Sequence, residues 1–220
     1  MREESMKTHQ DLYIGLGANS PDTFFTELAE RTVATWSRDR AREQDSRQFG
    51  ESMYLFVRQA DAALPGALVA VAKAEEGRWY VTNVVPTESG ELAYDEYNGI
   101  LNEFCHQLVR PVADELGVSV ELTKPQLEPE DIMSAEAARL LRRFSASANK
   151  STRGSHPSDQ ERWMHFLVVT HRDGSEPDAD VLRRFLIEDG WSEDAAAHLA
   201  SEYEFARELL NTYIRGEQLR

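Results

Sequence analysis

Residues 53–85, "MYLFVRQADAALPGALVAVAKAEEGRWYVTNVV", decide the fold. They contain three runs rich in β-branched and aromatic residues, at 53–60, 67–74 and 78–85, a composition that favours β-strands. "LPG" and "EEG" separate the runs, and such breaks are typical of turns. The second break is short enough for a β-hairpin. The stretch therefore predicts a small, mostly antiparallel sheet.

The segments on either side of this stretch predict strands and covering helices. "LYIGL" (12–16) predicts a strand, and Ser20 followed by Pro21 predicts the start of a helix. The apolar positions Phe24, Leu28, Thr32 or Val33, and Trp36 have helical spacing, so we expect this helix to reach residue 36. Residues 37–52 have mixed charges and no apolar period, which indicates a loop or a frayed helix end. Residues 1–10 are expected to form a frayed tail.

After the meander, residues 92–116 predict a long amphipathic helix, which Pro111 should kink or divide. Its apolar stripe consists of Tyr97, Ile100, Leu101, Phe104, Leu108 and Val112. Gly117 closes the helix, and residues 118–123 predict another strand. The first region of the chain, 11–123, is therefore expected to be a sheet with covering helices.

Beyond a proline-marked linker at 124–132, every periodic segment is helical. We expect helices near 131–147, 158–171, 178–188 and 192–214. The last has Ser192 as its N-cap, and its expected buried stripe is Ala195, Leu199, Tyr203, Ala206, Leu210 and Tyr213. The predicted class is α+β, with a helical region at 130–214 that packs with 11–123 as one cooperative unit.

Composition limits the classes of function. The chain of 220 residues has a formal net charge of −15, which disfavours binding to nucleic acids and to anionic membranes. It has a single cysteine, so neither an intramolecular disulfide nor a cysteine-built zinc site is expected. No apolar stretch suits a membrane span, and the polar start "MREESMKTHQ" does not resemble a signal peptide. We therefore expect a cytoplasmic bacterial protein.

The turn after the first strand, Gly15-Leu16-Gly17, lacks the third glycine of a dinucleotide fingerprint and the Gly-Lys-Ser/Thr of a P-loop. "YIGLGANSPD" (13–22) resembles the opening strand and turn of the pterin pyrophosphokinases, and "SHPSDQERWMHFLVV" (155–169) resembles a late His-Pro and Arg stretch of that family. The resemblance implies a pair of aspartates for magnesium before a strand, which has no match in this chain. We interpret the turn as a structural corner.

No residue pattern predicts catalysis, a cofactor or a metal. Cys105 and His106 are neighbours on a predicted helix, where their side chains diverge, so a buried thiol is expected rather than a nucleophile. His156, His165 and His171, with acidic neighbours, lack the spacing of a helical metal site. We therefore assign no catalytic residue, cofactor or metal ligand.

The most informative segment is "RLLRRFSASANKSTRGSHPSDQERW" (139–163). Its first part, 139–154, carries five basic residues and no acid, a local reversal of sign in an acidic chain. Such a segment can bind phosphate or an acidic partner, or pair with the protein's own acids near a helix C-terminus. The candidate anion- or partner-binding residues are Arg139, Arg142, Arg143, Lys150, Arg153 and His156.

Residues 176–210 have the outline of a helix-turn-helix, but the second helix is acidic and would be repelled by DNA. A packed helical hairpin is the better interpretation. The principal hypothesis is a non-catalytic protein-binding or regulatory module of a multi-component system. One alternative is an enzyme or binding protein for a phosphorylated or nucleotide ligand that uses 139–163. A second is an acidic mimic of nucleic acid that inhibits a basic partner. The sequence leaves the oligomeric state open.

Overall fold

The computed structural model describes residues 6–31, 33–48, 52–74 and 78–218. The predicted α+β class is confirmed. The chain divides into two compact units. The N-terminal unit is Thr8–Pro125, and the C-terminal unit combines the start of the chain, as far as Lys7, with the residues from Gln126 onwards.

The N-terminal unit is built on a six-stranded sheet in the order β3-β4-β5-β6-β2-β7, and every neighbouring pair is antiparallel. Its strands are β2 (Leu12–Gly15), β3 (Trp36–Arg38), β4 (Met53–Arg58), β5 (Ala67–Lys73), β6 (Trp79–Pro86) and β7 (Ser119–Leu122). The predicted meander is confirmed as β4, β5 and β6. Residues 75–77, which we expected to turn the second hairpin, lie outside the described residues, but Lys73 pairs with Trp79 on either side of them.

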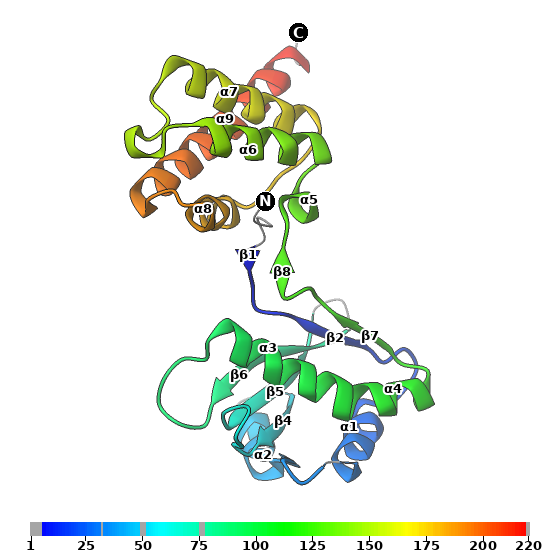
Figure 1. Ribbon diagram of the computed structural model, residues 1–220. Coiled ribbons are helices and arrows are strands. Elements are labelled where there is room, and N and C mark those ends of the chain that lie inside the picture. Colours follow the sequence, from blue (N-terminus) through cyan, green and yellow to red (C-terminus); the bar gives the residue numbers. More distant parts are fainter. Residues whose placement is uncertain (1–5, 32, 49–51, 75–77, 219–220) are drawn as a thin grey trace. The chain divides into compact units, whose positions relative to one another are not determined.

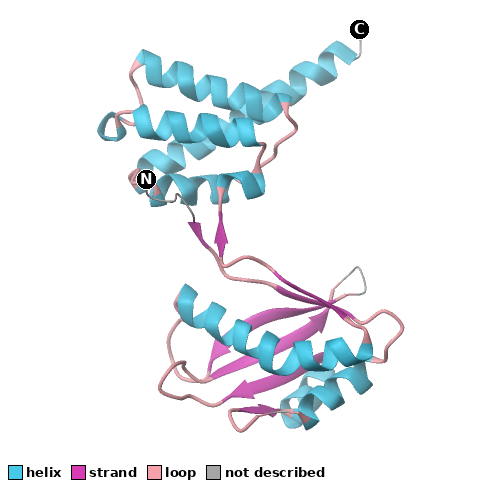
Figure 2. Ribbon diagram, turned by 45° about the vertical axis from the view of Figure 1, so that its right-hand side comes forward, coloured by secondary structure: helices cyan, strands magenta, loops and turns pink. Residues whose placement is uncertain are grey.

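One face of this sheet is covered by the predicted helical segment 92–116, which lies across the strands in Figure 2. The segment consists of α3 (Tyr94–Glu103), a π-helical turn η1 (Phe104–Val109) and α4 (Arg110–Leu116). Alternate strand residues such as Ile14, Phe56 and Val71 are buried against its apolar stripe, as the period of two along a strand requires. The core of this unit therefore lies between the sheet and these helices.

The π-helical turn is where the predicted effect of Pro111 appears. Proline cannot donate the backbone hydrogen bond that a continuing α-helix needs, and its ring crowds the preceding turn. The wider π-turn at Phe104–Val109 ends immediately before Arg110 and Pro111, so the segment is divided without losing its stripe. Such local π-turns are a known way of accommodating a break in the α-helical hydrogen bonds.

Three expectations for the start of the chain were wrong. The first helix, α1 (Pro21–Glu30), ends before residue 36, because Trp36 belongs to β3; Thr32 lies outside the described residues. Residues 40–48 form a helix of their own, α2 (Arg40–Gln48). Residues 1–5 of the expected tail lie outside the described residues, and Met6 and Lys7 form β1, which pairs with β8 (Gln126–Leu127).

The C-terminal unit is otherwise helical (Figure 1). It contains α5 (Pro129–Ile132), α6 (Ala135–Ser147), a short 3-10 turn η2 (Lys150–Thr152), α7 (Pro157–Arg172), α8 (Ala179–Glu188) and α9 (Glu193–Gln218). The four predicted helices are thus confirmed, whereas the predicted linker 124–132 contains β8 and α5. The Ser134 hydroxyl accepts a hydrogen bond from the Ala137 amide at 3.1 Å and caps the N-terminus of α6. This cap starts α6 as a helix separate from α5.

These helices enclose a second core that includes Phe144, Trp163, Phe166, Leu186 and Trp191. The predicted α8–α9 hairpin is confirmed, because the two helices pack against each other. The Ser192 hydroxyl caps α9 by accepting from the Ala195 amide at 3.3 Å. In the described part of the chain, no helix combines the length and hydrophobicity needed to cross a bilayer.

Candidate functional site

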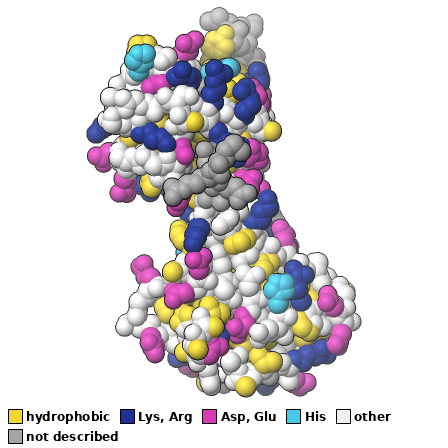
Figure 3. All heavy atoms as spheres, in the orientation of Figure 1, with side chains coloured by type: hydrophobic (Ala, Val, Ile, Leu, Met, Phe, Trp, Pro, Cys, Tyr) yellow, Lys and Arg dark blue, Asp and Glu magenta, His cyan; other side chains and the backbone are white. Residues whose placement is uncertain are grey.

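The basic residues that we selected from the sequence lie on α6, on the loop that follows it and at the start of α7. Arg139, Arg142 and Arg143 are on α6, and Lys150 opens the turn η2. Arg153 adopts a left-handed backbone conformation with φ of 57° at the end of that turn. Figure 3 shows Lys and Arg side chains gathered over α6 and α7 on the visible face of the C-terminal unit.

Two of these arginines are neutralised within their own unit. The Arg139 guanidinium pairs with Glu136 at 2.7 Å, and Arg142 pairs with Glu130 at 2.6 Å through its second nitrogen. The hydrogen bonds from the two arginines lower the pKa of Glu136 and of Glu130. Such pairs at a surface contribute little stability, but they occupy the guanidinium faces that an external anion needs.

Lys150 belongs to a polar cluster between α6 and the α8–α9 turn. Its ammonium group donates to the Asp189 carbonyl and lies 3.3 Å from the Asp189 carboxylate. The buried Ser145 hydroxyl bonds to the same carboxylate and accepts from the Trp191 indole N–H at 2.6 Å. Because each polar group is satisfied by another group of the cluster, we interpret it as a structural junction of the helices.

Arg153 and His156 have weaker or local roles. Arg153 lies 4.0 Å from Asp194, and both side chains are largely exposed, so this pair is loose. His156 occupies the N-cap of α7, where its ring nitrogen accepts from the Ser158 amide at 3.3 Å and shares a 2.7 Å hydrogen bond with the Ser158 hydroxyl. His156 therefore caps the N-terminus of α7 with the kind of side-chain hydrogen bond that Asn or Ser usually provides at this position.

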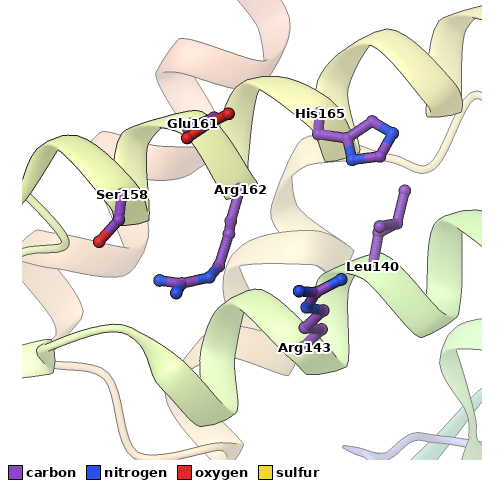
Figure 4. A pocket seen from close by; sticks show the side chains of 6 residues that line it. All are labelled: Leu140, Arg143, Ser158, Glu161, Arg162 and His165. Atoms are coloured by element: carbon purple, nitrogen blue, oxygen red, sulfur yellow. The ribbon is translucent and has the colours of Figure 1, made fainter.

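Arg143 is the predicted residue that lines the cavity between α6 and α7. This cavity, the α6–α7 groove, has a volume of about 350 Å³. It is lined by Leu140, Arg143, Ser158, Glu161, Arg162 and His165. Figure 4 shows the Arg143 and Arg162 guanidinium groups directed into the space between the two helices, with Glu161 on the far side of α7 from Arg143. The groove thus brings two guanidinium groups and an imidazole to one surface.

The α7 residues of the groove are not among the candidate residues predicted from the sequence. Glu161, Arg162 and His165 follow Ser158 by three, four and seven positions, a spacing that gathers side chains on one side of a helix. The sequence pattern draws attention to His165 only as a possible metal ligand, and to Arg162 only as part of the segment 139–163. The helical spacing of polar residues beside the buried Trp163 and Phe166 was the signal that could have identified this face.

A second exposed surface lies on α9. Its predicted buried stripe is covered as far as Tyr203, which is 3% exposed, but the prediction was wrong at Tyr213, which is 66% exposed. Ala206 and Arg207 still lie beside α7, where they line a pocket with Leu167 and Thr170, and the C-terminal end of α9 extends past the other helices of its unit (Figures 1 and 2). We define the α9 apolar face as Phe205, Ala206, Leu209, Leu210, Tyr213 and Ile214. Phe205 is 70% exposed and Leu209 56% exposed.

Other candidate chemistry is not supported by the geometry. Cys105 is buried in the core of the N-terminal unit, and burial raises the pKa of its thiol, which opposes formation of the nucleophilic thiolate. Within the described ranges, no three His, Cys, Asp or Glu side chains are placed to hold a metal ion.

The two segments that resemble the pterin pyrophosphokinases belong to different compact units, 13–22 to the N-terminal unit and 155–169 to the C-terminal unit. At the Gly15–Gly17 turn, the Leu16 carbonyl accepts from the Asn19 backbone amide and side chain, each at 3.0 Å. These bonds close the corner between β2 and α1. No protein-family model, curated protein or solved structure matches the chain.

Proposed function

We propose that this chain is a non-catalytic protein-binding module, one component of a multi-protein assembly, and that the α9 apolar face is its docking surface. One observation carries the proposal: Phe205, Leu209 and Tyr213 are each more than half exposed on consecutive turns of one helix. Contiguous apolar surface of this kind typically marks an interaction site.

The pattern of residues along α9 supports this interpretation. At 3.6 residues per turn, the six residues of the α9 apolar face occupy one half of the helix circumference. The polar residues of the same segment occupy the other half; they are Glu204, Arg207, Glu208, Asn211, Thr212 and Arg215. A helix with such complete segregation is amphipathic, yet within its own unit the apolar half is only partly covered. A partner that covered it would bury each large side chain for about 1.5–3 kcal/mol.

The net charge of the chain indicates the chemistry of the partner. Beside the α9 apolar face the charges are mixed, since Glu208 lies 3.8 Å from Arg215, but the whole chain carries a net charge of −15. A second copy of the chain would bring like charges together, which costs free energy at an interface. We therefore expect an amphipathic segment of another protein, with Lys or Arg beside its apolar stripe.

The test compares two matched double variants. Phe205→Gln with Leu209→Gln removes two exposed apolar side chains one turn apart on α9. Met164→Gln with Val168→Gln makes the same change on α7, where the side chains are 57% and 52% exposed. The tagged chains are recovered from the native host, the protein lost from the α9 variant is identified, and its binding to each purified chain is measured by calorimetry.

We expect the α9 variant to bind this protein at least about 100-fold more weakly, since two buried apolar side chains are lost, and the α7 variant to bind normally. Circular dichroism and thermal unfolding should be alike for all three chains. Equal binding by the α9 variant and the parent chain would contradict the proposal. Reversible self-association of the parent chain that the α9 variant abolishes would replace the partner by a second copy.

A further inference from the structure

We propose that the α6–α7 groove binds the phosphate group of a small phosphorylated molecule, independently of the α9 apolar face. The groove lies on the only part of the sequence where basic residues accumulate without acids, 139–154, and on the helix that follows. Two helices contribute to it, so the backbone that carries its cationic residues is packed on the core of the C-terminal unit rather than placed on a loop.

Arg143 is the central residue of this proposal. Its neighbours on α6, Arg139 and Arg142, are paired with Glu136 and Glu130. The Arg143 guanidinium, in contrast, forms no ion pair or hydrogen bond with any residue that the structure describes, and it points into the groove. An unneutralised guanidinium in a chain of net charge −15 is available to an anion, and its planar N–H groups match two oxygens of a phosphate.

Arg162 supplies the second guanidinium from the facing helix. Its Nη1 donates to the Asp159 carboxylate at 2.7 Å, and Asp159 is itself 5% exposed and accepts from the Asn149 amide at 3.2 Å. This buried carboxylate orients Arg162 and leaves its other N–H groups free to bind. His165, one turn further along α7, lines the same groove. The phosphate would therefore lie between Arg143 and Arg162, with His165 beside it.

The size and lining of the groove indicate the class of ligand. Its volume of about 350 Å³ exceeds that of a bare oxyanion and falls within the range of small-molecule sites. Leu140 is the apolar residue of the lining, which contains no Phe, Tyr or Trp. Because nucleobases are usually held by aromatic stacking, we infer a sugar phosphate or a similar monoester rather than a nucleotide.

The experiment is a calorimetric titration of the full chain with ribose 5-phosphate at low ionic strength. The variant Arg143→Gln removes the unpaired guanidinium. The control Arg139→Gln makes the same change in net charge one turn earlier on α6, at an arginine paired with Glu136. We expect saturable binding to the parent chain, a loss of about tenfold or more in affinity for Arg143→Gln, and little loss for the control.

Three results would overturn the proposal. They are an absence of saturable binding, unchanged affinity in Arg143→Gln, and an equal loss in both variants, which would indicate a general effect of net charge. A separate titration uses AMP, which carries an adenine base on the same phosphorylated ribose. Similar affinities for the two compounds support recognition of the phosphate, whereas AMP binding about tenfold more tightly would show that the base is held and would overturn the ligand class.

Glu161, the acidic residue of the lining, provides a test in which the affinity for the ligand should rise. Glu161 repels an anion in the groove without contacting the Arg143 side of it (Figure 4). The variant Glu161→Gln should therefore bind ribose 5-phosphate a few-fold more tightly. A weaker affinity in this variant would contradict the placement of the phosphate between the two arginines.

Discussion

At the scale of single residues, a buried charge network surrounds Arg58 in the N-terminal unit. This side chain is 1% exposed and binds Glu103 through two nitrogens, at 3.1 and 3.0 Å, and Asp61 at 2.6 Å. Burial alone would lower the pKa of Arg58, but the hydrogen bonds that it donates to Glu103 and Asp61 outweigh burial and raise the pKa. The Trp36 indole also donates to Glu103 at 2.7 Å. Arg58 therefore links its own strand, β4, to the following loop through Asp61 and to helix α3 through Glu103.

Arg58→Gln should destabilise the chain by about 3–5 kcal/mol, because it removes a buried guanidinium and leaves the partly buried Glu103 without its counter-charge. The control is Arg31→Gln, since Arg31 also binds a glutamate through two nitrogens, Glu115 at 2.6 and 2.5 Å, but on the surface. This loss should cost much less, because an ion pair at the surface contributes little to stability. Urea unfolding measures both; equal costs for the two variants would show that burial does not decide the value of the pair.

The pH of this measurement matters because of Asp61. Hydrogen bonds from the Leu64 and Ala63 amides, and then from Arg58, lower the pKa of its carboxyl group in the folded chain. A group with a lowered folded pKa stabilises the fold above its unfolded pKa, and this contribution is lost as the pH falls through the folded value. The comparison of Arg58→Gln with Arg31→Gln therefore belongs at neutral pH, where Asp61 is ionised in both states.

At the scale of elements, the sequence predicted those whose apolar residues repeat with a clear period. The meander and the stripe of 92–116 are buried as expected, because alternation and helical spacing report directly which side faces a core. Helix α2 was missed because its described side chains include only one buried residue, Glu43. That carboxylate pairs with Arg38 and accepts from the Leu55 amide at 3.0 Å, and tertiary pairing of this kind has no periodic signature in a sequence.

The end of α4 gives an element-scale prediction. Gly117 has a φ of 66° and turns the chain from α4 into β7, and a Cβ there would meet no atom within 4 Å. Gly117→Ala should therefore destabilise the chain by about 1 kcal/mol through backbone strain alone. Gly216 in α9 also has open space but no positive φ, so Gly216→Ala should be neutral or stabilising in the same urea assay. A neutral Gly117→Ala would contradict this account of the turn.

At the scale of the whole molecule, the sequence predicted a sheet region followed by a helical region but not the contribution of the N-terminus. The residues of β1 and β8 form a strand pair of two residues each, too short for any pattern to appear in either segment. Likewise, the sequence located the basic segment but could not say which arginines are neutralised, because Glu130 and Glu136 become partners only when α5 and α6 are formed. Only Arg143 among the predicted residues faces the groove.

The two hydrophobic cores have no residue in common, and this arrangement leads to a test of cooperativity. Met6, at the start of the chain, is 1% exposed in the C-terminal unit, where β1 contacts α8. Met6→Ala should cost about 2–5 kcal/mol and reduce hydrogen-exchange protection in α6–α9. Leu101→Ala, which opens a cavity in the other core, should reduce protection in β4–β6 instead.

Hydrogen exchange of the full chain, followed by mass spectrometry of its peptides, measures both units in one sample. The cooperative unit expected from the sequence and the two separate cores lead to different outcomes. Because Met6 belongs to the C-terminal unit and Leu101 to the core of the N-terminal unit, we expect each substitution to affect its own unit. Loss of protection in both units from either substitution would instead mean that the N-terminal and C-terminal units unfold together, and that Met6 supports the sheet as well as the helices.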